Sequence, residues 1–386
     1  MAPPVPVVAP PDPVTAPPEP APADAPTGLR ATVLARIKAR EPLVDLNLAG
    51  ADLHDLDLSG AVLVRLDLKG AKLLRCKLVD ARLTDAQLVD ADLTDADLTG
   101  AELSRADLSR ATLARARLDG AMLAEANLTG ARAQGASLTG AKMARARLSR
   151  GEWDGARFDR ADLTNADLTS ASFGEAHFEG ATLIEARLTD ARGAGAIFDD
   201  ARLPSALAHG ASFPGASFRR VDAAGSLWEG ATLDKASFAG ATLKDANLSR
   251  ASCAGASFAG ADASGANLAR VAGDGADLSD ARLEKADLRQ ARLRDACFVG
   301  AKLRGLLAGK ADFSGCSFVR ADLQGTTLRA ARLGGASFAY ANLEGADLRD
   351  ADFDHTNVFG ASRKTAKMGA GAKGIVEIDP GPDAQG

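Results

Sequence analysis

The chain carries an alternation of apolar and polar positions with a period of five residues. From Leu46 to Gly360, 63 consecutive blocks read small residue, polar residue, Leu or Phe, then two variable residues, and the frame never slips. Ala fills the first slot in 51 of these blocks, and Leu, Phe, Met or Trp fills the third slot in 54. Repetition this regular predicts a repeat architecture, in which each repeat packs only on its neighbours.

A period of five fits neither the 3.6 residues of a helical turn nor the alternation of a single strand. The pattern instead predicts a coil in which each block forms one side. The first and third slots of a short extended segment point inward, and the second slot points outward between them. The fourth and fifth slots turn the corner, which agrees with frequent Gly at the fifth slot and with Pro204 and Pro214 at the fourth.

Several blocks match the pattern A(D/N)LXX outright, among them residues 91–95 (ADLTD), 96–100 (ADLTG) and 126–130 (ANLTG). On these blocks the chain resembles the pentapeptide repeat family, and the resemblance covers most of its length. It implies an all-β fold, a right-handed quadrilateral parallel β-helix with four repeats per coil. Coils that rise by roughly 4.8 Å would then stack into a rod on the order of 75 Å long.

The outward charges test the coil size independently, because a four-sided coil stacks residues 20 apart. Signs alternate at this spacing, whereas a spacing of 15, for a three-sided coil, gives no regular alternation. Opposite charges on adjacent strands contribute about 0.2–1 kcal/mol each. We predict four structural charge ladders: Asp57, Lys77, Asp97 and Arg117; Arg65, Asp85, Arg105, Glu125 and Arg145; Asp55, Arg75, Asp95 and Arg115; and Arg292, Asp312, Arg332 and Asp352.

The N-terminal flank differs from the repeat, which we assign to residues 43–360. Residues 1–27 are rich in Pro and Ala and predict a disordered tail, either a spacer or a ligand for an aromatic-lined groove. Residues 28–42 predict a short helix with Thr27 as its N-cap and with an apolar face formed by Leu29, Val33, Leu34 and Ile37. We expect this helix to cap the first coil, with membrane binding as the alternative.

The C-terminal tail, residues 361–386, begins after the degenerate block 356–360. Ile375, Val376 and Ile378 predict a short edge strand. Because no strong capping helix follows, we expect this end to be the site of any homodimer.

Composition narrows the classes of function. The 386 residues include 46 basic and 51 acidic side chains, for a net charge of −5, and only 4% aromatics. These mixed charges argue against a basic nucleic-acid footprint, so we expect no direct nucleic-acid binding. No apolar run reaches the roughly 18 residues that a membrane-spanning helix needs, and the sequence shows no signal peptide. We therefore expect no membrane insertion and a cytoplasmic location, with export that needs no cleaved signal left open.

Catalytic and metal-binding patterns are absent from the sequence. The four cysteines (Cys76, Cys253, Cys297 and Cys316) form no CxxC pair, and three of them occupy inward slots. The four histidines lie in outward or corner slots, and the many aspartates follow the second slot of the repeat. A narrow interior filled by Ala and Leu leaves no substrate cavity. We therefore predict a protein that is not an enzyme, with no catalytic, cofactor-binding or metal residues.

The pattern weakens at a few positions. Small residues replace Leu in third slots at Ala133, Gly193, Ala208, Ala223, Cys253, Ala263, Gly273 and Ala308. We expect Trp153 to fill the space left by Ala133, one coil away. Candidate partner contacts are the outward Leu207, Leu227 and Leu307 and the unusually large Trp228. A softer middle between 190 and 275, a partner-contact face and neutral drift all stay open.

Two functions of different class follow. We favour a rigid scaffold or adaptor that binds a protein partner of unknown identity along the β-helix surface, with a resemblance to the tails of proteins of bacterial contractile secretion apparatus. The family resemblance implies the alternative, a DNA-mimicking protector of DNA gyrase or topoisomerase IV of the fluoroquinolone-resistance type. Such a mimic needs a sustained negative field, and alternating charges cancel beyond a Debye length of roughly 8–10 Å.

Overall fold

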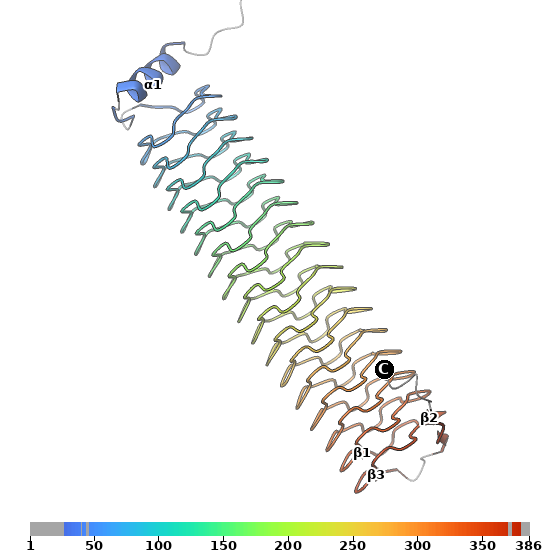
Figure 1. Ribbon diagram of the computed structural model, residues 1–386. Helices are drawn as coiled ribbons and strands as arrows, with labels where there is room; N and C mark the ends of the chain where they lie inside the picture. The colour runs from blue at the N-terminus through green and yellow to red at the C-terminus, as the bar shows by residue number, and fades with distance from the viewer. Residues whose placement is uncertain (1–26, 40, 44–45, 370–372, 380–386) are drawn as a thin grey trace, which may run out of the picture.

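The structure, a computed structural model, describes residues 27–39, 41–43, 46–369 and 373–379. Parallel bridges join second-slot residues 20 apart, from Asn47 and Asp67 to Asn342 and Ser362. Four blocks therefore make one coil, as the charge alternation predicted. The coils stack into a single long rod, with the N-terminal helix at one end and the last strands at the other (Figure 1). The predicted disordered tail lies, except for Thr27, outside the described residues.

The backbone of each block pairs almost completely with the neighbouring coils. The N–H of Leu53, a third slot, donates to the carbonyl of Lys72 at 2.9 Å, and the N–H of Lys72 donates back to the carbonyl of Ala51 at 2.9 Å. The fifth-slot N–H of Asp55 donates to the carbonyl of Leu74 at 2.9 Å. The N–H of the fourth slot is the remaining donor in each block, and it needs a side-chain or solvent partner.

The corners are tight turns closed by a hydrogen bond, for example from the N–H of Ala51 to the carbonyl of Leu48 at 3.0 Å. The fifth-slot residue adopts a positive φ, 66° at Gly60 and 59° at Asp55. A positive φ at the third of four turn residues is typical of a type II turn. Gly takes this conformation freely, whereas for another residue a positive φ costs roughly 1–2 kcal/mol of conformational free energy.

First-slot and third-slot side chains fill the interior of the rod. Six phenylalanines form one stacked column, with ring centroids 4.4–5.2 Å apart: Phe158, Phe178, Phe198, Phe218, Phe238 and Phe258. Small third-slot residues make room for large neighbours. A Cβ at Gly193 would lie 2.5 Å from Cε1 of Phe213, and one at Gly273 would lie 2.8 Å from Cδ2 of Leu293. Volume is therefore balanced between adjacent coils.

Helix α1 (Thr27–Ala39) lies at the first coil. It begins at Thr27, the residue predicted as its N-cap. Val33 is fully buried in the core, and the other three residues of the predicted apolar face are partly buried against it. Arg30 Nη1 also donates to the carbonyl oxygen of Asp52 at 3.4 Å.

The register changes at the last strand pair. Strand β1 (Asp347–Leu348) pairs with β3 (Lys367–Met368) in the register of the other coils, with Asp347 opposite Lys367. Strand β2 (Thr356–Asn357) pairs with β4 (Ile375–Val376) one residue short of that register. The predicted edge strand is thus present at Ile375 and Val376, while Ile378 lies just beyond it. The repeat frame also continues past Gly360, because Thr365 has the corner conformation, with φ of 58°.

Candidate interaction surface

The abundant second-slot aspartates complete the turns. Asp92 Oδ1 accepts the fourth-slot N–H of Thr94 at 3.0 Å and its hydroxyl at 2.6 Å. Asn127 Oδ1 accepts the N–H of Thr129 at 3.2 Å in the same way. These side chains satisfy the one backbone donor that the coils leave over, which explains the preference for Asp and Asn at this slot.

The predicted charge ladders lie at adjacent positions on neighbouring coils. At the corners the contacts are short and bidentate: Arg75 Nε lies 2.7 Å from Asp55 Oδ1, and Arg105 Nε lies 2.8 Å from Asp85 Oδ1. Hydrogen bonds from these arginines lower the pKa of both aspartates. Arg115 and Asp95 form a third bidentate pair, at 2.7 Å. Other members are farther apart, at 3.9 Å for Arg65 with Asp85, 3.9 Å for Arg145 with Glu125 and 3.5 Å for Arg117 with Asp97. Asp57 and Lys77 are bridge neighbours, as are Lys77 and Asp97.

In the ladder near the C-terminal end, the predicted residues are bridge neighbours, but Arg292 has a different ion-pair partner from the one predicted. Arg292 bonds Asp274 at 3.1 Å, while Arg294 takes Asp312 at 2.7 Å. Arg332 lies 3.8 Å from Asp312, and Asp352 is the bridge neighbour of Arg332. A long arginine side chain reaches a fourth-slot carboxylate as easily as one directly across the bridge, so the stacking of the coils does not by itself select the partner.

Three of the four candidate partner contacts share one outward column. Leu207 and Leu227 are bridge neighbours, and Leu307 lies on the same face because it is five coils beyond Leu207. Leu307 is 41% exposed. We call Leu207, Leu227 and Leu307 the leucine column. These are apolar side chains in slots that are polar in most other blocks.

The position of Trp228 contradicts the prediction that it contacts a partner. It is only 1% exposed, because its third slot points inward whatever the size of the side chain. Its Nε1–H donates to Ser226 Oγ at 2.8 Å, and its ring packs edge-on against Phe218 with centroids 5.4 Å apart. The equivalent indole of Trp153 lies over Gly151, where a Cβ would clash with its Nε1.

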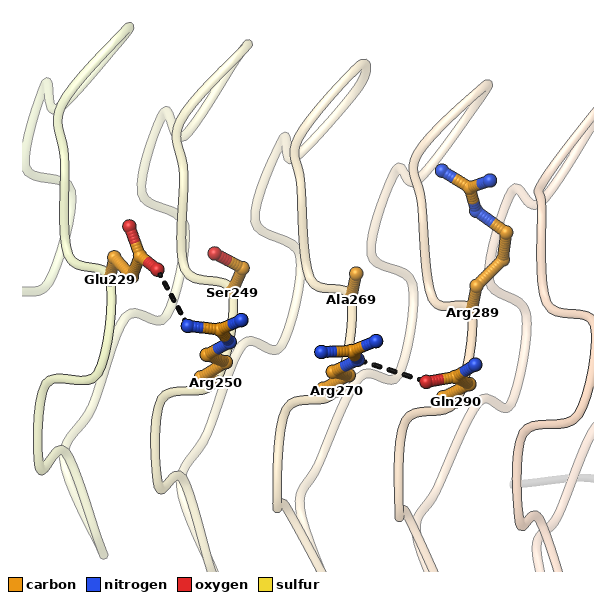
Figure 2. Close-up of a pocket in the computed structure, with 7 residues that line it drawn as sticks. All are labelled: Glu229, Ser249, Arg250, Ala269, Arg270, Arg289 and Gln290. Atoms are coloured by element: carbon orange, nitrogen blue, oxygen red, sulfur yellow. Dashed lines mark hydrogen bonds and ion pairs between the residues drawn. The ribbon is translucent and has the colours of Figure 1, made fainter.

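A row of cations follows the leucine column at the next corner. We call these residues the basic corner: Arg250, Arg270, Arg289, Lys310, Arg329 and Arg349. Figure 2 shows Arg250, Arg270 and Gln290 on successive coils, with Ser249, Ala269 and Arg289 in the adjoining row. Arg250 lies 3.4 Å from Glu229, and Arg270 donates to the neutral Gln290 Oε1 at 2.9 Å. Our sequence prediction missed this row because it sought alternating signs, whereas fifth slots 250, 270 and 310 carry the same sign.

The described residues offer few candidates for reactive thiols or metal ligands. All four cysteines are free, and burial raises the pKa of the Cys76 thiol to about 11 and of Cys253 to about 12. Within the described residues, one group, Asp159, His177 and Glu179, brings potential metal ligands within 4.8 Å of one another. Arg157 Nε already donates to Asp159 at 2.9 Å.

In the part of the chain that the structure describes, no helix has both the length and the apolarity needed to span a membrane.

Comparison with known proteins gives the family. The model described as Pentapeptide repeats (8 copies) matches residues 43–207 and 211–362 in overlapping segments. The chain therefore belongs to the pentapeptide repeat family, whose members form β-helical solenoids. No curated protein matches the chain.

Among solved structures, HetL of the cyanobacterium Nostoc sp. PCC 7120, involved in heterocyst differentiation regulation, is 31% identical over 66% of this chain and 90% of its own, with a TM-score of 0.21. A thylakoid-lumen pentapeptide repeat protein of Arabidopsis thaliana is 32% identical over 31% of this chain and 69% of its own, with a TM-score of 0.22. The plasmid-mediated fluoroquinolone resistance protein QnrB1 is 18% identical over 57% of this chain and 90% of its own, with a TM-score of 0.22.

Proposed function

We propose that the chain is a non-enzymatic, rigid scaffold that binds a protein partner along the face of the leucine column. The observation that carries the proposal is the placement of Leu207, Leu227 and Leu307 in one outward column. Each replaces a polar residue in a slot where the backbone does not require an apolar one. Apolar side chains gathered on one face of a rod favour contact with another protein.

The build of the rod supports a binding role. Side chains of the first and third slots fill the interior of the described coils, so the functional groups lie on the outer surface. Stacked coils hold these groups at a fixed spacing, which lowers the entropic cost of ordering them on binding. The proposal includes a right-handed winding and a capping role for α1, whose Val33 is buried against the first coils.

The test is affinity capture from the native cell with the full chain and with a triple variant, L207K/L227K/L307K. Lys already occupies second slots, as at Lys142, so the variant should fold. The matched control, T182K/T232K/T242K, adds the same three charges at second slots of two other faces. Partners lost with the leucine variant and kept with the control support the proposal. Equal capture by both variants contradicts it.

A supercoiling assay separates the alternative function. The wild-type chain, added to DNA gyrase or topoisomerase IV, should neither inhibit supercoiling nor protect the enzyme from a fluoroquinolone. Potent inhibition or protection would replace the scaffold proposal with the topoisomerase one.

A further inference from the structure

We propose that three cations of the basic corner, Arg250, Arg270 and Lys310, bind an acidic, extended polypeptide segment that runs along the rod axis. The inference rests on the proposed scaffold function and names the chemistry of its partner. Asp and Glu carboxylates of that segment would contact the corner, while neighbouring apolar side chains would reach the leucine column.

The three cations form a line. Each occupies a fifth slot, at a corner that follows the face of the leucine column, and all three are exposed. Arg250 and Arg270 are one coil apart, and Lys310 is two coils further, so the line spans roughly 14 Å at about 4.8 Å per coil. About four residues of an extended peptide cover this length. Leu307 lies in the same block as Lys310, which places an apolar contact beside the last cation.

Two of these cations, Arg270 and Lys310, lack the carboxylates that neutralise arginines elsewhere. Arg75 and Arg105 form bidentate pairs one coil away, whereas Arg270 donates to the neutral amide of Gln290. Among the described residues, no ion pair joins Arg270 or Lys310 to a carboxylate. Arg250 has one contact with Glu229, at 3.4 Å, and both side chains are exposed. Like charges on adjacent coils repel, so a bound anion would stabilise this corner.

The surroundings favour a polypeptide over a nucleic acid. Asp287, in the outward column of the same face, pairs with Arg289 at 2.5 Å, and Asp312 lies on the next face. These paired carboxylates flank the cations and confine them to a single line, which matches one extended chain better than the broad phosphate surface of a duplex. No side chain at this corner is aromatic between residues 249 and 350, so a single strand has no ring on which to stack its bases. The corner positions are 249–250, 269–270, 289–290, 309–310, 329–330 and 349–350. Guanidinium groups match carboxylates in geometry, and a narrow acidic chain fits between the flanking columns.

The test measures fluorescence anisotropy of a labelled poly-glutamate peptide of about eight residues with the full chain. The variant R250E/R270E/K310E should weaken binding at least about tenfold, a change of about 1.4 kcal/mol. The control R160E/K235E/K285E changes net charge equally at fifth slots of the other three corners. It should weaken binding much less. Equal losses in the two variants would overturn the proposal, because they would show an effect of net charge alone.

Two further arms complete the test. A duplex and a single-stranded oligonucleotide of matched charge are titrated in parallel, and tighter binding to either, lost with R250E/R270E/K310E, would overturn the assignment to a polypeptide. Circular dichroism checks that each variant folds. Because the peptide assay needs no native partner, it can fail while leucine-dependent capture succeeds, or succeed while capture fails. The two proposals are therefore separable.

Discussion

The side chain of Asp199 accepts the backbone N–H of Arg219, one coil away, with a distance of 3.0 Å from N to Oδ1. The same carboxylate accepts the hydroxyl of Ser217. Arg219 is a fourth-slot residue, and its block has Ser217 rather than Asp or Asn at the second slot. An aspartate from the preceding coil thus replaces the missing acceptor. The same arrangement recurs where Asp154 accepts the N–H of Gly174 and where Asp234 accepts that of Ala254.

We predict that D199A destabilises the rod by about 1–2 kcal/mol, because the N–H of Arg219 loses its acceptor. The neighbouring D200A removes the exposed ion pair with Arg220 and should cost less stability than D199A. The double variant D199A/S217D restores an acceptor within the block and should recover most of the loss. Urea unfolding measures the stability, and exchange of the Arg219 amide reports the bond. Failure of S217D to rescue would contradict this account.

Gly193 and Phe213 should be energetically coupled. G193A places a Cβ 2.5 Å from Cε1 of Phe213 and should destabilise the chain by about 1–3 kcal/mol. The double variant G193A/F213L should lose less than the sum of the single variants. G309A is the control, since the nearest atom to its new Cβ is 3.6 Å away. Additive losses in a thermal or urea double-mutant cycle would argue against the coupling.

Acid should weaken the C-terminal coils through Asp347. The hydrogen bond from Arg349 is the largest cause that lowers the pKa of Asp347 from 3.8 to about 2. A carboxyl whose pKa is lower in the folded state stabilises that state fully above its unfolded pKa and loses this effect as pH falls. The contribution should therefore disappear between about pH 4 and 2. D347N should reduce stability at neutral pH and flatten this part of the urea midpoint profile; an unchanged slope would contradict the prediction.

One thiol should react in the folded chain. Cys76, Cys253 and Cys316 are buried, and burial raises the pKa of Cys316 to about 12. Cys297 occupies an outward second slot and is partly exposed. A thiol-disulfide reagent at about pH 8 should label Cys297 quickly and the others only after unfolding. C297S should abolish the fast phase, and a fast phase that persists in C297S would show that the coils open around a buried cysteine.

The sequence predicts the coil well because slot position determines which way each side chain points. The four-block coil follows from alternating charges such as Asp55 and Arg75, which indeed lie side by side. Trp228 was misread because its size suggested a contact, although its slot directs it inward. Arg292 pairs with Asp274 rather than with Asp312, because a long side chain can reach a carboxylate that is not directly across the bridge. The shifted register at β4 could not be predicted because it lies in the tail, whose sequence no longer follows the five-residue repeat.

The closure of each coil after four blocks has a consequence for how such a rod tolerates insertions. Adding one complete coil lengthens the molecule by about 4.8 Å and returns every later side chain to its original face. Adding a single block instead rotates everything downstream by a quarter turn. Between residues 227 and 250, such an insertion would move Arg250, Arg270 and Lys310 to a different corner from the one beside Leu207 and Leu227. The apolar interior of the rod would stay filled. An insertion therefore also changes the direction in which all later side chains point around the rod axis. Only the insertion of whole coils keeps residues from distant blocks on the same face.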